Sequence, residues 1–131
     1  MNTVPASLGI TRLGQVSVNI YDLDRATAFY RDTLGLPLLF IAGNMAFFDC
    51  NGVRLMLAHP EKKEFDHPSS VLYFAVPDIK AAHRQMLAAS VHFEDEPHLL
   101  VRMPNHDLWM TFFRDTEQNL LALMSEVPRA K

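Results

Sequence analysis

The stretch between residues 13 and 36 constrains the fold most, because it predicts a strand, a capped helix and a glycine stop in immediate succession. Its first part alternates strictly: Val16, Val18 and Ile20 are apolar, while Gln15, Ser17 and Asn19 between them are polar. Such alternation predicts a half-buried strand over residues 13–20. Asp22 suits a helix N-cap, and Gly35 suits the left-handed position after the last turn. We therefore expect a helix over residues 22–34.

A second, degenerate copy of this unit follows later in the chain. YDLDRA near residue 22 matches PDIKAA near residue 78, and FFDCNGVRLMLA from Phe47 matches FFRDTEQNLLALM from Phe112. In the first copy we expect strands over 37–42, 45–50 and 53–59, joined by the hairpin signals Gly43-Asn44 and Asn51-Gly52. In the second we expect strands over 71–76, 107–113 and 120–126, one further strand formed by 91–93 and 97–103 with a break at 94–96, and a helix opened by Pro77-Asp78. Each copy reads β-α-β-β-β.

This repeat predicts an α+β fold made of two tandem βαβββ modules in one domain, residues 1–131. The first module spans about residues 10–60 and the second about 70–127, with a charged, proline-bounded linker over 60–69. Two units of about 60 residues indicate paired modules, because a solenoid normally needs three or more.

Composition excludes several functions. A net charge of −3 gives no general attraction to nucleic acid or to an anionic membrane, and no apolar run is long enough to span a bilayer. The first residues do not resemble a secretory signal, so we expect a cytoplasmic protein. Cys50 is the single cysteine, which excludes an intrachain disulfide and a cysteine zinc cluster.

The motifs VNIYDLDRATAFYRDTLGL and FFRDTEQNLLALMSE, together with the repeat, resemble the vicinal oxygen chelate superfamily. That superfamily includes glyoxalase I, extradiol dioxygenases, methylmalonyl-CoA epimerase, and the fosfomycin and bleomycin resistance proteins. The resemblance implies a cupped, mostly antiparallel eight-stranded sheet with helices on its convex face. It also places the family's metal ligands on Gln15, Met56, Leu72 and Ala122. Only Gln15 carries a donor in common family use, since Met, Leu and Ala cannot hold a hard divalent ion.

Alternation and a simple hairpin register predict which side chains share the concave face. The register places Arg102 opposite Asp107, Leu100 opposite Trp109 and His98 opposite Thr111. The expected ligand-binding set is Gln15, Ser17, Asn19, Arg54, Met56, Leu72, Phe74, His98, Arg102, Trp109, Thr111 and Ala122. An apolar, aromatic lining with a few polar groups is typical of small-molecule sites.

Several of these residues also have a structural interpretation. Trp109 could be a half-buried packing residue, Arg102 could pair with Asp107, and His98 could be solvated. The polar face of the first strand could simply be exposed, although buried polar side chains without partners are costly. A metal site built from His98 and His106 is disfavoured, because the register separates them by about five residues, at roughly 3.3 Å each.

Two functions fit these observations. The first is a metal-independent protein, similar to the bleomycin resistance type, that binds an aromatic or anionic small molecule in the cup. The second is a metal-dependent lyase, isomerase, epimerase or dioxygenase with non-standard ligands. No cofactor is expected in the first case, and a divalent metal is expected in the second. Unpaired edge strands and the family resemblance favour a homodimer.

Overall fold

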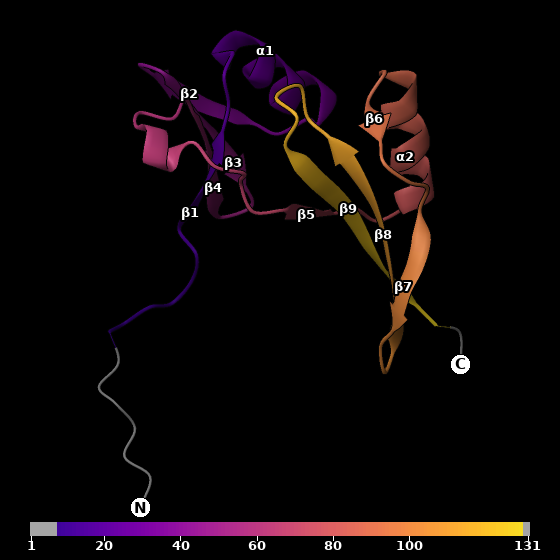
Figure 1. The fold of residues 1–131 in the computed structure, drawn as a ribbon. Coiled ribbons are helices and arrows are strands. Elements are labelled where there is room, and N and C mark those ends of the chain that lie inside the picture. Colours follow the sequence, from indigo (N-terminus) through magenta and orange to yellow (C-terminus); the bar gives the residue numbers. More distant parts are fainter. Residues whose placement is uncertain (1–7, 130–131) are drawn as a thin grey trace, which may run out of the picture.

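The computed structural model describes residues 8–129, which form two mixed β-sheets and two α-helices (Figure 1). In the first module the order is β1 (Gln15–Asn19), α1 (Leu23–Ala28), a π-helical segment η1 (Phe29–Thr33), β2 (Leu38–Ala42), β3 (Met45–Cys50) and β4 (Val53–Ala58). A 3-10 turn, η2 (Lys63–Phe65), lies in the linker. The second module contains β5 (Leu72–Ala75), α2 (Ile79–Ala88), β6 (His92–Phe93), β7 (His98–Arg102), β8 (His106–Arg114) and β9 (Leu120–Pro128).

The first sheet has the strand order β1-β4-β3-β2, with β1 parallel to β4 and the other neighbours antiparallel. Asn51 and Gly52 connect β3 to β4, and both have positive φ angles, of 51° and 97°. Positive φ at both central residues is what a type I′ hairpin turn requires, as the Asn-Gly pair predicts. The second sheet has the order β5-β9-β8-β6, with β5 parallel to β9 and β7 also paired with β8.

Each helix begins at an aspartate N-cap and covers one face of its own sheet. The Asp22 side chain accepts a hydrogen bond from the Arg25 N–H, and that of Asp78 accepts one from the Ala81 N–H. These bonds satisfy backbone donors that the first helical turn leaves free. The expected helix over 22–34 is present, but its second half is π-helical and ends before Gly35, whose φ is 75°.

Both modules contribute to one buried apolar cluster. The sheets contribute Val18, Ile20, Leu55 and Leu57 from the first module and Phe113, Leu121 and Leu123 from the second. The helical segments add Phe29 and Tyr30 of α1–η1 and Ile79 and Met86 of α2. The apolar face of each sheet is therefore the helix-covered face. The opposite face of β1 carries Gln15, Ser17 and Asn19, as alternation predicts.

The structure confirms the α+β fold with paired βαβββ modules. The sheet is divided in two and is not closed, and residues 8–129 contain nine strands instead of eight. The extra strand results from the break expected at 94–96, which separates β6 from β7. Among the described residues, no helix is both long and apolar enough to cross a membrane.

Candidate functional site

The uncovered face of the first sheet carries a row of polar and sulfur-containing side chains. Gln15 accepts a hydrogen bond from Arg54 Nε at 2.7 Å, and its Nε2 lies 3.7 Å from the Met56 sulfur. The Arg54 guanidinium also lies 5.3 Å from the centroid of the Phe47 ring, a cation–π distance. Gln15, Arg54 and Met56 therefore share one face, as predicted. The Arg54 guanidinium already contacts Gln15 and Phe47 there.

A pocket of about 620 Å³ opens on this same face. Ser17, Asn19 and Met56 line it, as predicted from the sequence, and the linker after β4 forms its other wall. The lining is completed by Asn44, Met45, Ala58, His59, Pro60, Glu61, Phe65, His67, Ser69 and Ser70. Its volume lies within the range of about 300–1,000 Å³ typical of small-molecule sites.

Asn19 holds the linker over this pocket. Its Nδ2 donates to the carbonyl oxygens of Phe65, at 2.7 Å, and His67, at 3.0 Å. Its backbone N–H donates to Ser69 Oγ at 3.0 Å. The Tyr21 hydroxyl adds a hydrogen bond to Asp66, which raises the pKa of Tyr21. The polar face of β1 therefore anchors the linker and also contributes to the pocket lining.

Two histidines in the lining present hydrogen-bond acceptors. His59 Nδ1 lies 3.2 Å from the Pro60 carbonyl oxygen, and His67 Nδ1 lies 3.0 Å from that of Pro68. A carbonyl oxygen can only accept, so Nδ1 carries the proton in each neutral ring. Nε2 of each ring is then left with a lone pair that can accept a hydrogen bond from a ligand.

The expectation that Leu72 and Phe74 face the cup is wrong. Both pack against the helix-covered core, whereas Tyr73 is 47% exposed. Gln15 precedes its helix cap Asp22 by seven residues, but Leu72 precedes Asp78 by only six, so the repeat aligns Gln15 with Val71. A shift of one residue moves a strand side chain to the opposite face.

The expected register of the β7–β8 hairpin is also wrong beyond Val101, which lies opposite Leu108. Arg102 lies opposite Asp107 as predicted, but a bulge between Leu99 and Val101 places Leu99 opposite Trp109 and His98 opposite Met110. A bulge inserts one residue and shifts every later pair. The expectation that β8 presents Trp109 and Thr111 to the cup is wrong for a different reason. Thr111 lies opposite Leu123, which belongs to the buried apolar cluster, so this face of β8 is the helix-covered one.

Trp109 packs on the helix-covered side, where the Lys80 ammonium lies 5.2 Å from its ring centroid. Thr111 is fully buried and its hydroxyl donates to the Asp95 side chain at 2.7 Å. The opposite face of β8 carries Phe112, which lies opposite Ala122 and contacts Tyr73 with a ring-centroid distance of 6.0 Å. Trp109 and Thr111 are therefore structural residues.

The remaining predicted site residues lie apart from the pocket. Ala122 is on the cup-side face of the second sheet, between Tyr73 and Phe112, but it is fully buried. His98 Nδ1 contacts the Glu96 carbonyl oxygen at 2.9 Å, and Arg102 is exposed on β7. The alternative pairing of Arg102 with Asp107 is not made, because Arg129 Nη1 donates to the Asp107 carboxylate at 2.6 Å.

The residues at the family's metal positions do not fit a divalent metal ion. Met56 and Ala122 offer no hard donor, and Leu72 lies on the opposite face. Between residues 8 and 129, no three His, Cys, Asp or Glu side chains gather in a way that could hold a metal ion. Gln15 alone cannot supply a coordination sphere, which needs at least three protein ligands in catalytic zinc sites.

Sequence reasoning missed the linker as a pocket wall. Residues 60–69 are charged and proline-bounded, a pattern typical of a solvated connection, and nothing in it predicts that Asn19 binds its carbonyl oxygens. Met45 could have been found, because it lies opposite Ala58 on β4, two residues from Met56 on the same face.

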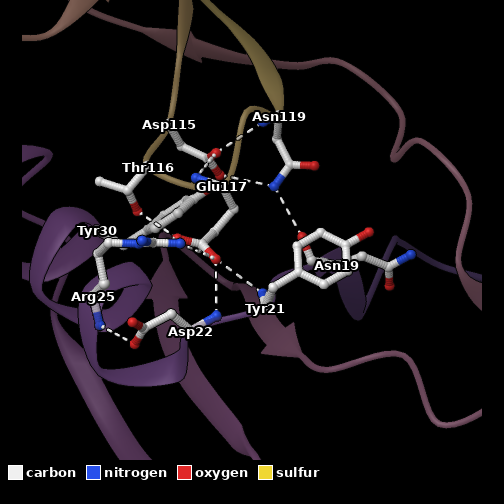
Figure 2. A network of polar contacts seen from close by, with 9 residues as sticks. All are labelled: Asn19, Tyr21, Asp22, Arg25, Tyr30, Asp115, Thr116, Glu117 and Asn119. Carbon is white, nitrogen blue, oxygen red and sulfur yellow. Dashed lines mark hydrogen bonds and ion pairs between the residues drawn. The ribbon is translucent and has the colours of Figure 1, made fainter.

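A second polar cluster joins the two modules, on the helix side (Figure 2). The turn between β8 and β9 lies beside α1, and its Glu117 accepts hydrogen bonds from the backbone N–H groups of Tyr21 and Asp22, both at 2.9 Å. Arg25 donates from Nε at 2.8 Å, and Thr116 donates from its hydroxyl at 2.9 Å. Burial raises the pKa of Glu117, but these hydrogen bonds outweigh it and lower the value to about 2.

Asp115 extends this cluster into the core. It accepts a hydrogen bond from the Tyr30 hydroxyl at 2.7 Å, and its other oxygen accepts from the N–H groups of Glu117 and Asn119. Asn119 Nδ2 donates to the Asn19 carbonyl oxygen at 2.9 Å. Burial is the main cause of a raised pKa at Tyr30. This cluster fixes the first module's β1–α1 connection against the second module.

The chain belongs to the glyoxalase/bleomycin resistance protein/dioxygenase superfamily, whose family model matches residues 12–123. A curated relative, the uncharacterized protein YraH of Bacillus subtilis (strain 168), is 25% identical over 129 residues, covering 86% of this chain and 96% of YraH.

Solved structures share the fold. A lactoylglutathione lyase from Agrobacterium tumefaciens superposes with a TM-score of 0.68 at 24% identity, covering 88% of this chain and 94% of the lyase. TnmS3, an antibiotic binding protein from Streptomyces sp. CB03234, superposes with a TM-score of 0.74 at 20% identity, covering 92% and 99%. Enzymes and binding proteins thus share this architecture, so the fold alone does not assign the activity.

Proposed function

We propose that this protein binds a small aromatic molecule in the pocket between the first sheet and the linker, without a metal ion, as a binding protein similar to the bleomycin resistance type. The pocket of about 620 Å³ carries the proposal, because it joins polar strand side chains to an apolar lining. The antibiotic-binding neighbour supports the same class of function.

The lining favours an uncharged aromatic ligand that donates hydrogen bonds. Met45, Met56 and Phe65 offer sulfur and ring surfaces, which pack well against aromatic rings. His59 and His67 offer acceptor nitrogens, and Glu61 offers a carboxylate. No Lys or Arg is among the residues that line this pocket in the described part of the chain. The expected anionic ligand depended on Arg54 and Arg102, so we now favour the aromatic alternative.

The competing hypothesis is an enzyme that uses a metal held by unusual ligands. Elemental analysis after incubation with Zn²⁺, Ni²⁺, Mn²⁺ or Fe²⁺ and removal of the excess separates the two. We expect less than one-tenth of an ion per chain. One retained ion per chain would contradict the metal-independent proposal and favour a lyase, isomerase or dioxygenase.

A thermal-shift screen of aromatic metabolites and antibiotics tests the binding proposal directly. A ligand at 100 times its Kd should stabilise the protein by about 2.7 kcal/mol, which raises the melting temperature measurably. In Ser17→Phe the new ring on β1 occupies the pocket, so the ligand should no longer raise the melting temperature. Gln15→Phe is the matched control, because Gln15 lies on the same strand and face but outside the pocket lining. Equal binding by both variants would overturn the proposal.

We also propose a homodimer formed through apolar edge strands. β2 is the outer strand of the first sheet, and its Leu39, Phe40 and Ile41 are 50%, 47% and 51% exposed. β7 exposes Leu99, Leu100 and Val101 in the same way. Edge strands with consecutive exposed apolar side chains favour association with another chain.

A further inference from the structure

The two modules meet at two junctions that the internal repeat relates to one another. Each junction combines the helical segment of one module with the last hairpin turn of the other module. In the first, the β8–β9 turn approaches α1, and in the second, the β3–β4 turn approaches α2. The helix caps Asp22 and Asp78 are 56 residues apart, so Ala26 and Tyr30 correspond to Ala82 and Met86.

The two turns differ in length. Arg114 pairs with Leu120, which leaves the five residues 115–119 to form the β8–β9 turn. Cys50 pairs with Val53, which leaves only Asn51 and Gly52 to form the β3–β4 turn. The longer turn fills its junction with Glu117 and Asp115, and Asp115 reaches Tyr30 (Figure 2). The shorter turn has no residue that could fill the second junction in this way.

A crevice of about 470 Å³ occupies the second junction. Its walls are mostly apolar, formed by Leu34 and Leu36 after η1, Phe74 and Val76 around β5, and Met86 of α2. None of the described residues that line it is charged, whereas Asp115 and Arg25 both belong to the first junction. Charge-free walls disfavour ions, and such a volume is sufficient for a small organic molecule.

Two amide side chains can make hydrogen bonds to a ligand in this crevice, beside the hydroxyl groups of Thr33 and Tyr73 and the Cys50 thiol that also line it. Gln85 of α2 and Asn51 of the short turn both line it. Neither amide makes a hydrogen bond within residues 8–129, and both are exposed to solvent. Each can donate and accept. A ligand with one polar group could therefore bury its ring against Phe74 and Met86 and place that group at an amide.

We propose that this inter-module crevice is a second ligand site, distinct from the pocket under the linker, for a compact, uncharged aromatic molecule with a single hydrogen-bonding group. The site exists because the β3–β4 turn is too short to fill the space that the β8–β9 turn fills in the other junction. The pocket under the linker has histidines, serines and a carboxylate, so its ligand needs more polar groups.

Indole is a suitable probe, because it is uncharged and has one N–H donor. In a methyl-labelled protein we expect saturable chemical-shift changes at Met86, Leu34 and Leu36 on titration with indole. The methyl groups of Met45 and Met56 line the other pocket and should not shift. Shifts at Met45 and Met56 alone, or no saturable change, would overturn the proposal. Changes at Met86 on protein dilution without indole would also overturn it, since they would mean that a second copy covers the crevice.

Substitutions on α2 sharpen the test. Ala82→Leu fills the crevice and should weaken indole binding at least ten-fold, while Ala88→Leu, on the exposed side of the same helix, should leave it unchanged. Gln85→Leu keeps the volume nearly constant and removes the amide. It should weaken indole binding about three- to ten-fold and leave the binding of toluene, which has no hydrogen-bond donor, unchanged. Gln85→Leu decides the question even if Ala82→Leu fails to fold, and equal indole affinity in Gln85→Leu and the parent would contradict the assigned polar contact.

Discussion

Arg25 Nε donates to Glu117 Oε2 at 2.8 Å across 92 positions of the chain, and the Glu117 side chain is fully shielded from solvent. The bond links the first helix of one module to the last turn of the other. Its carboxylate also accepts from two backbone N–H groups at the start of that helix. Glu117 thus neutralises an arginine and satisfies backbone donors that would otherwise have no partner.

Replacing Glu117 with Ala should destabilise the protein by about 2–4 kcal/mol, because the N–H groups of Tyr21 and Asp22 lose their acceptor in a buried place. Urea unfolding measures this. Arg25→Ala should lower the free energy of unfolding by less, since Arg25 is half exposed and its loss leaves the two backbone hydrogen bonds to Glu117 intact. The control is Asp32→Ala, which breaks only the exposed pair with Arg31. Equal losses in all three variants would contradict this account.

Acid should weaken the same contact. The pKa of Glu117 is about 2 in the folded protein and close to 4.5 when unfolded, so its folded value is depressed. The stability that it contributes is therefore complete above about pH 4.5 and declines as the pH falls toward 2. Urea midpoints measured from pH 7 to pH 2 should fall in this window. The decline should be shallower in Glu117→Gln, and an identical decline in both proteins would mean that other carboxylates cause it.

Exchanging Trp109 for Ala should reduce stability and leave ligand binding unchanged. Trp109 of β8 packs against the start of α2. Trp→Ala in a core costs about 3–5 kcal/mol, so we expect a loss at or below the lower end of that range for this half-buried ring. Denaturant unfolding and a ligand titration should be run on the same sample. Loss of binding with unchanged stability would place Trp109 at the ligand instead.

Removing the Asn19 side chain should free the linker. In Asn19→Ala the carbonyl oxygens of Phe65 and His67 lose their donor. A hydrogen bond that contributes about 1.4 kcal/mol changes the equilibrium constant for local opening of the linker about ten-fold. Hydrogen exchange at the N–H groups of Phe65, Asp66 and His67 should accelerate by about that factor. Ser17→Ala is the control, because Ser17 lies on the same strand face without a bond to the linker. Unchanged exchange in Asn19→Ala would mean that the linker is held by other contacts.

The proposed homodimer predicts a dimeric mass by light scattering at micromolar concentrations. A lysine in place of Ile41 on β2 should shift the protein toward monomer, because a charged side chain on an edge strand opposes pairing. Lys80→Ile, on α2 of the second module and not on β2, serves as a comparison. A monomeric mass for the parent protein would contradict the proposal.

Local sequence rules account for most of the fold. The aspartate caps, the Asn51-Gly52 turn and the alternation of β1 all depend on contacts within a few residues, so the pattern predicts them directly. Ser17 and Asn19 lie on the uncovered face of β1 for that reason, and Met56, which the family resemblance suggested, lies beside Ser17 on β4. The errors at Leu72, Phe74, Trp109 and Thr111 arose because the side of a strand that faces the core depends on the strands it pairs with and the helix that covers it, which the local pattern does not encode.

The sequence by itself determined the repeat, the order of elements, the family and the poor fit of a metal at the family's positions. Those conclusions follow from residue types at fixed spacings. Only the tertiary structure decided that the linker closes the pocket, that Glu117 joins the modules and that the second junction is open. These depend on contacts between residues dozens of positions apart, such as Asn19 with Phe65 and Arg25 with Glu117. No local periodicity encodes such distances, because they are set by how the two modules pack against one another.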